Sequence, residues 1–191
     1  MTDLELPLSV VPQQEKLSLD KLADKVFIDI LSRIPGVKMR FATPEEDSGV
    51  VSIDRSLAVD VVGYKDGKHA FTAQITTAST QDKIDKMKRQ MLAMPFVQTS
   101  KLSDHLENDP PLVPRFNIRI DNGTMRKFEL NPDIDAHPDI KKTIREQLQF
   151  NIRYLLTKLS SDLQGVPLKG PMLKKAQGTD QYKQIQALQE M

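Results

Sequence analysis

The polar face of one short segment carries the residues whose types and spacing could seed a metal site. Asp60 is the carboxylate of this group; Gln74 follows after thirteen intervening residues, and Thr76 lies two positions later. Hard cations such as Mg²⁺ bind carboxylate oxygens together with neutral oxygen ligands. Asp60 is therefore the candidate metal ligand of the chain, and Gln74 and Thr76 are the polar residues predicted to share its face.

Other catalytic templates find no match in the sequence. The chain has no cysteine, which excludes disulfide scaffolds, zinc ribbons, iron-sulfur clusters and cysteine nucleophiles. Its three histidines, His69, His105 and His137, lie far apart in the sequence and are predicted to be surface or turn residues. The glycines form no phosphate-binding loop and no dinucleotide-binding fingerprint, and no Gly-x-Ser-x-Gly elbow occurs. Asp60 is thus the only candidate metal ligand that remains after these exclusions.

A β-hairpin over residues 56–78 is predicted to position these polar side chains. Lys65-Asp66-Gly67 suits a type I turn with Gly67 in the left-handed conformation and a bulge, which pairs Tyr64 with Lys68. This register forms three apolar pairs, Val61 with Phe71, Val59 with Ala73 and Leu57 with Ile75. A slip of one residue would scatter these apolar side chains over both faces. The opposite face then carries Asp60, Thr72, Gln74 and Thr76.

Helices and short strands are predicted on either side of this hairpin. The apolar stripe after Ser18 predicts an amphipathic helix that Pro35-Gly36 ends. A second helix is predicted to begin after Ser79 or Thr80 and to end at Pro95. Strands are predicted at residues 37–42 and 96–99, and a loop at residues 43–54. The predicted order up to residue 99 is therefore helix, three strands, helix and short strand.

The remaining residues are predicted to add a second hairpin and a long helix. Strands at 115–120 and 124–130 are predicted to meet at Asp121-Asn122-Gly123, because Asn-Gly is a strong hairpin signal. Residues 100–114 are predicted to be irregular, and Pro138 opens a helix expected to reach residue 163. The chain is accordingly divided into an extended N-terminal arm (1–17), one α/β domain (18–163) and a C-terminal tail with a short amphipathic helix (164–191).

The element order, with Asp60 on the second strand, resembles that of the PD-(D/E)XK nuclease-like superfamily. The resemblance covers about residues 18–100 and implies an α+β fold: a mixed sheet with an α-β-β-β-α-β core, here followed by a second β-hairpin and a long C-terminal helix. Members of the family place an Asp on the second strand and Glu-x-Lys on the third. The two carboxylates hold magnesium, and the Lys positions or activates the attacking water.

The third strand of this chain departs from the family motif. Gln74-Ile75-Thr76 stands where the family has Glu-x-Lys. Gln keeps a neutral oxygen but loses the charge, and Thr cannot replace an ammonium group. The resemblance therefore implies a degenerate catalytic set of Asp60, Gln74 and Thr76, with Asp60 as the one retained metal ligand. Replacement groups could come from other segments, a basic one from Lys83 or Lys86 and an acidic one from residues 45–47 or Asp54.

Composition narrows the expected partners and location. The chain has 191 residues and a net charge of +1, so electrostatics alone selects no partner. Residues 1–60 carry a net charge of −4 and residues 111–191 a net charge of +4. No stretch approaches the roughly 18 to 20 apolar residues that span a membrane, and the N-terminus lacks the basic region of a secretory signal. The expected location is the cytoplasm, or a particle assembled there, with no membrane contact.

Three functions compete on this sequence. The first is a non-catalytic binding or assembly protein, in which a nuclease-like core is a scaffold and no cofactor is needed. Its partners would be other proteins, including copies of itself, as in phage particles or secretion machinery, because the N-terminal arm and the Gln-rich end resemble segments that order on a neighbour. The second is a magnesium-dependent PD-(D/E)XK-type nuclease with a rearranged site. The third is a nucleic-acid-binding accessory protein that uses residues 111–191.

Overall fold

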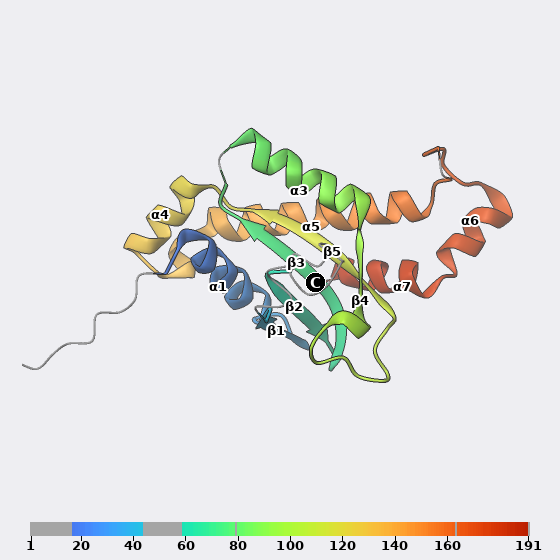
Figure 1. The fold of residues 1–191 in the computed structure, drawn as a ribbon, viewed down its shortest axis with the longest axis horizontal. Coiled ribbons are helices and arrows are strands. Elements are labelled where there is room, and N and C mark those ends of the chain that lie inside the picture. The colour runs from blue at the N-terminus through green and yellow to red at the C-terminus, as the bar shows by residue number, and fades with distance from the viewer. Residues whose placement is uncertain (1–16, 44–58, 79, 163, 191) are drawn as a thin grey trace, which may run out of the picture.

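A five-stranded mixed sheet forms the centre of the molecule (Figure 1). The computed structural model describes residues 17–43, 59–78, 80–162 and 164–190. The strand order is β1-β2-β3-β5-β4, in which β3 and β5 are parallel and the other neighbours are antiparallel. The strands are β1 (Val37–Phe41), β2 (Val61–Lys65), β3 (Lys68–Thr76), β4 (Phe96–Gln98) and β5 (Leu112–Arg119). Together with the helices, this sheet confirms the predicted α+β class.

Helices of very different lengths surround the sheet. The longest, α5, runs from the α4 end of the molecule towards α6 (Figure 1). The α-helices are α1 (Leu19–Leu31), α3 (Gln81–Ala93), α4 (Asn122–Leu130), α5 (Pro138–Leu159), α6 (Gly170–Gln177) and α7 (Asp180–Ala187), with 3-10 turns at Thr99–Lys101, Ile134–Ala136 and Leu188–Glu190. No described helix is long and apolar enough to cross a membrane.

The main core lies on the sheet face that α1, α5 and α7 cover. The Ser18 side chain caps α1 by accepting a hydrogen bond from the Lys21 amide, as the sequence predicts. Periodic apolar residues of α1 and α5, such as Phe27 and Ile144, pack against Phe71 and Phe116 of the sheet. Burial of this apolar area is the main stabilising contribution to the fold.

The first hairpin has the predicted faces but not the predicted register. Asp66 and Gly67 both adopt positive φ, so a two-residue turn pairs Lys65 directly with Lys68. A bulge between Gly63 and Tyr64 then changes the pairing, and Val61 lies opposite Ala73 instead of Phe71. Because the error is two residues, Val61, Phe71, Ala73 and Ile75 still face the main core. Val59 does not, since it lies before β2 and packs with Val62 and Val113 in a second, smaller core cluster. Leu57, and with it one predicted pair, lies outside the described residues.

The second predicted hairpin is wrong, because residues 122–130 form helix α4. Asp121 caps this helix, and its carboxylate accepts hydrogen bonds from the backbone and hydroxyl groups of Thr124. Met125 and Phe128 bury one side of the helix at a spacing of three residues. The preceding strand is longer than predicted, since β5 begins at Leu112 and includes Pro114.

The C-terminal part of β5 has no described strand partner on the side of β4. Helix α5 covers this edge with two side-chain amides. Strand β4 pairs only with residues 112–114 of β5. Beyond it, Gln147 accepts from the Arg119 amide at 2.7 Å and donates to the Arg119 carbonyl at 2.6 Å. Asn151, one helical turn later, makes the same pair with Asn117 at 3.2 and 3.1 Å. The two amides replace a missing strand and satisfy backbone groups that would otherwise be unpaired.

The C-terminal segment packs on the chain's own core. Ile185 and Leu188 are buried among residues of α5 and the sheet. Lys65 donates to the Ala187 carbonyl at 3.0 Å, and Gln184 donates to the Ala70 carbonyl at 3.3 Å. The amphipathic pattern of this segment is therefore matched by an intramolecular surface.

Candidate functional site

The predicted site residues lie together on the sheet face opposite the main core. Asp60 lies directly before β2, and its carboxylate reaches the amide of Ile75, the residue after Gln74; Gln74 itself is paired with Asn117 of β5. Thr76 follows on the same face of β3, paired with Arg119. The structure thus brings the Asp60 carboxylate to β3, between Gln74 and Thr76 in the sequence, through its hydrogen bond with the Ile75 amide.

The side chains of this row bond to the protein's own backbone. The Asp60 carboxylate accepts a hydrogen bond from the Ile75 amide at 2.5 Å, while the Asp60 amide donates to the Ala73 carbonyl at 2.9 Å. The Thr76 hydroxyl accepts from the Ala78 amide at 3.1 Å. Asp60 therefore stabilises the start of the β2–β3 pairing, and Thr76 stabilises the end of β3.

A buried cation is the neighbour that sequence analysis missed. Arg115 of β5 is only 1% exposed and is paired with Thr72 across the parallel strands. Burial lowers the pKa of Arg115 to about 10, and the charge of Asp60 opposes that shift. Arg115 and Asp60 consequently form an electrostatically coupled pair on this face, and the carboxylate offsets the cost of burying a guanidinium group.

Asp60, Gln74 and Thr76 do not fit the magnesium site of the PD-(D/E)XK nuclease-like superfamily. The three residues offer one carboxylate, which already accepts a backbone amide, and a buried arginine lies close enough to interact with it. Lys86 is on the exposed surface of α3; the side chain of Lys83, residues 45–47 and Asp54 lie outside the described residues. Within the described part of the chain, no group of three or more His, Cys, Asp or Glu could hold a metal ion. No catalytic step is therefore assigned through magnesium.

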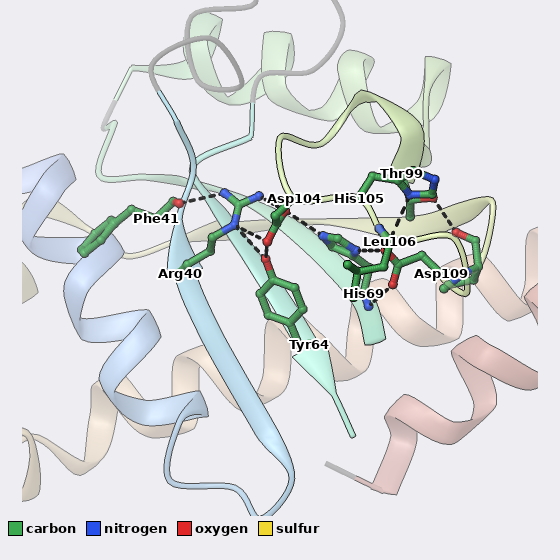
Figure 2. Close-up of polar contacts among 10 residues, drawn as sticks. Arg40, Phe41, Tyr64, His69, Thr99, Asp104, His105, Leu106 and Asp109 are labelled. Carbon is green, nitrogen blue, oxygen red and sulfur yellow. Dashed lines mark hydrogen bonds and ion pairs between the residues drawn. The ribbon is translucent and has the colours of Figure 1, made fainter. Parts of the chain in front are cut away.

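A second polar cluster surrounds His69 and joins the sheet to the segment after β4. Figure 2 shows the His69 ring between the carboxylates of Asp104 and Asp109. The Nδ1 atom of His69 lies 2.7 Å from Asp109, and Nε2 lies 3.0 Å from Asp104. Asp104 also accepts two hydrogen bonds from the Arg40 guanidinium, at 3.0 and 2.5 Å, and one from the Tyr64 hydroxyl. These contacts attach residues 104–109 to β1, β2 and β3. We call Arg40, Tyr64, His69, Asp104 and Asp109 together the His69 cluster.

The electrostatics of the His69 cluster favour ionised carboxylates. Burial alone would raise the pKa of Asp104, but hydrogen bonds from Arg40, Tyr64 and His69 hold it well below its usual value. Burial also opposes ionisation of Asp109, yet the amides of Leu106 and His69 and the His69 ring lower its pKa. For Tyr64, burial and the hydrogen bond to Asp104 raise the pKa above its ordinary value.

The His69 cluster is suited to holding structure rather than to acid–base chemistry. Both ring nitrogens of His69 are occupied by contacts with carboxylates of the protein itself. The ring is fully buried, which leaves no lone pair directed at a substrate. His69 was expected on the surface and is instead buried; the 35 residues that separate it from Asp104 gave no local signal of the contact.

Comparisons with protein-family models, curated proteins and solved structures found no match to this chain.

Proposed function

We propose that this chain is a non-catalytic binding or assembly protein whose α+β core serves as a scaffold. The observation that carries the proposal is the bonding of Asp60, whose carboxylate accepts the Ile75 amide beside the buried charge of Arg115. A metal ligand at this position would have to give up contacts that stabilise the sheet. The Thr76 hydroxyl, where the resembling family has lysine, likewise serves the backbone.

The element order supports the idea that the scaffold shares its arrangement with the nuclease-like superfamily. Helix α1 precedes the antiparallel strands β1, β2 and β3, and α3 and the short strand β4 come between β3 and its parallel neighbour β5. The chain order from α1 to β4 is the α-β-β-β-α-β order that the resemblance implies, with β4 at the strand predicted for residues 96–99; in the sheet, β5 rather than β4 lies beside β3. The same order keeps a rearranged metal-dependent nuclease as the competing proposal.

A cleavage assay on the full chain separates the two proposals. Wild type and Asp60→Asn would be incubated with Mg²⁺ or Mn²⁺ and with single-stranded, duplex and branched DNA. A scaffold gives no metal-dependent cleavage in either chain, while Asp60→Asn unfolds at a lower temperature because it removes the charge beside Arg115. Cleavage by wild type that disappears in a folded Asp60→Asn chain would establish the nuclease instead.

Light scattering on the same wild-type sample addresses the partner. An average mass that rises with concentration would identify copies of the chain as partners. A mass of one chain at all concentrations directs the search to other proteins.

The thermal measurement on Asp60→Asn needs a matched control. Asp29→Asn changes an exposed carboxylate of α1 and should leave the unfolding temperature unchanged.

A further inference from the structure

One side of α5 carries an exposed aromatic residue between two opposite charges. Phe150 is 64% exposed. Glu146, four residues before it, and Arg153, three residues after it, are also exposed, and Tyr154 beside them is half-buried. Residues spaced by three and four share one face of a helix, so Glu146, Phe150 and Arg153 form a single stripe. We call these three residues the Phe150 stripe.

Both charges of the Phe150 stripe are available to a partner. Among the described residues, no ion pair involves Arg153. The Glu146 carboxylate lies 3.9 Å from the Lys142 ammonium, but both side chains are largely exposed, and such a pair contributes little to stability. Covering the Phe150 ring would remove apolar area from water while each charge still finds an opposite charge across the interface.

We infer that two copies of the chain associate through the Phe150 stripe, with their α5 helices antiparallel about a twofold axis. When two such helices pair around residues 149 and 150, Glu146 of each copy lies level with Arg153 of the other, and the Phe150 rings meet near the axis. A parallel pair would set like charges against each other, which is repulsive. The stripe is therefore self-complementary, as a twofold interface requires.

The size of this surface sets the expected strength of the contact. Stable complexes usually bury about 1,200–2,000 Å² in total. One face of a single 22-residue helix supplies only part of that area. The inferred dimer is therefore reversible and depends on protein concentration.

Sedimentation equilibrium of the full chain over a wide range of concentrations tests the dimer. The average mass of wild type should rise towards that of two chains. Phe150→Ala should weaken the association severalfold, because it removes the apolar centre of the interface. Leu130→Ala, which removes an exposed apolar side chain from α4, is the matched control and should leave the association unchanged. A wild-type chain that stays monomeric throughout would overturn the inference and assign the stripe to another protein.

Exchange of charges tests how the two helices are arranged. Glu146→Arg alone or Arg153→Glu alone places like charges opposite each other, so each should weaken the association severalfold at low salt. The double variant restores opposite charges and should recover most of the wild-type association. Arg145→Glu makes the same charge change where α5 borders a pocket next to α1, and it should have little effect. A double variant no better than the single ones contradicts the pairing.

Cysteine cross-linking reports the orientation, because the chain has no cysteine. In the antiparallel dimer Thr143 of one copy lies level with Thr157 of the other, whereas two Thr143 residues are about 20 Å apart at the usual helical rise. A mixture of Thr143→Cys and Thr157→Cys chains should therefore give cross-linked dimers with a short bismaleimide reagent. Either variant alone should give severalfold fewer. Equal yields in all three samples would rule out the antiparallel arrangement.

The inferred dimer rests on the proposed function, since it names a partner for a binding or assembly protein, but the two fail in different measurements. A monomeric chain without metal-dependent cleavage would refute the dimer and leave the scaffold proposal to other partners. Cleavage that disappears in a folded Asp60→Asn chain would refute the scaffold proposal, whatever the mass of the chain in solution.

Discussion

At the scale of single residues, Asp60 and His69 have the side chains of catalytic groups but contacts that stabilise the fold. The Asp60 carboxylate bonds to the Ile75 amide, and both nitrogens of the His69 ring lie against aspartates. A free lone pair and access to solvent are what would allow either group to act on a substrate. Both nitrogens of the His69 ring are occupied by aspartates and the ring is buried, so the residue type alone suggests more reactivity than the structure allows.

Gly63 is required by close packing against Phe71 at the β-bulge. A Cβ added at this position would lie 2.4 Å from the Cζ atom of the Phe71 ring. We expect Gly63→Ala to lower the free energy of unfolding by about 1–3 kcal/mol, the usual cost of overpacking a core. Urea unfolding followed by circular dichroism measures this change.

Gly67→Ala is the matched control for Gly63→Ala, since its Cβ meets nothing within 4 Å but its φ is +80°. Its cost should be about 1 kcal/mol, from the left-handed conformation alone. A Gly63→Ala chain as stable as wild type would show that the strands can move apart at the bulge and that the ring contact is not limiting.

At the scale of elements, periodicity predicted the faces of the first hairpin but not its turn. The apolar alternation of residues 69–75 has a period of two, so a register error of two residues leaves each side chain on its predicted face. The turn differs because Asp66 adopts a φ of 53°, which the type I interpretation did not expect. This local backbone choice, rather than the hydrophobic pattern, sets the pairing of Lys65 with Lys68.

The sequence Asp121-Asn122-Gly123 shows why the second hairpin was predicted wrongly. The same residue types start turns and cap helices, because a short polar side chain can accept backbone amides in both. The spacing of Met125 and Phe128 distinguishes the two structures: three residues apart, they share a face of a helix but not of a strand. The contacts of His69 could not be predicted this way, since they join segments distant in sequence.

The amides of α5 that cover the edge of β5 should contribute strongly to stability. Gln147→Leu or Asn151→Leu would leave the backbone groups of Arg119 or Asn117 without these partners. Each change should lower the free energy of unfolding by about 1–3 kcal/mol, the cost of unsatisfied buried polar groups. Hydrogen exchange measured by NMR should become faster at the affected strand amide.

Gln149→Leu, an exposed change of the same type on the same helix, controls for altered helix propensity and hydrophobicity. It should leave both the stability and the exchange of the β5 amides unchanged. Equal effects from Gln147→Leu and Gln149→Leu would mean that water replaces the side-chain amide at little cost, and that α5 does not protect the edge.

At the scale of the whole molecule, polar contacts attach the peripheral segments, which contribute little to the apolar core, to the rest of the fold. The His69 cluster fixes residues 104–109 to the first three strands, and Asp135 joins the turn before α5 to Arg33. The C-terminal helix α7 adds Ile185 and Leu188 to the main core. Because several of these attachments depend on ionised aspartates, the stability of the complete fold should depend on pH.

Acid should weaken the fold before carboxylates of ordinary pKa are fully protonated. The pKa values of Asp104, Asp109, Asp121 and Asp135 are all lowered in the folded chain. Each of these groups then contributes stability that is fully present above the unfolded carboxyl pKa of about 4 and is lost as pH falls towards the folded value. The urea midpoint should therefore decline steadily between about pH 5 and pH 3.

Asp104→Asn tests how much of this dependence comes from the His69 cluster. The variant cannot gain or lose a proton at residue 104, so it should be less stable than wild type at neutral pH and should lose less further stability in acid. Asp29→Asn, at an exposed position of α1, should follow the wild-type curve at every pH. Parallel curves for wild type and Asp104→Asn would mean that the Asp104 contacts with Arg40, Tyr64 and His69 form equally well around a neutral side chain. The acid sensitivity would then have to come from the other three aspartates, which the corresponding single Asn variants can measure in turn.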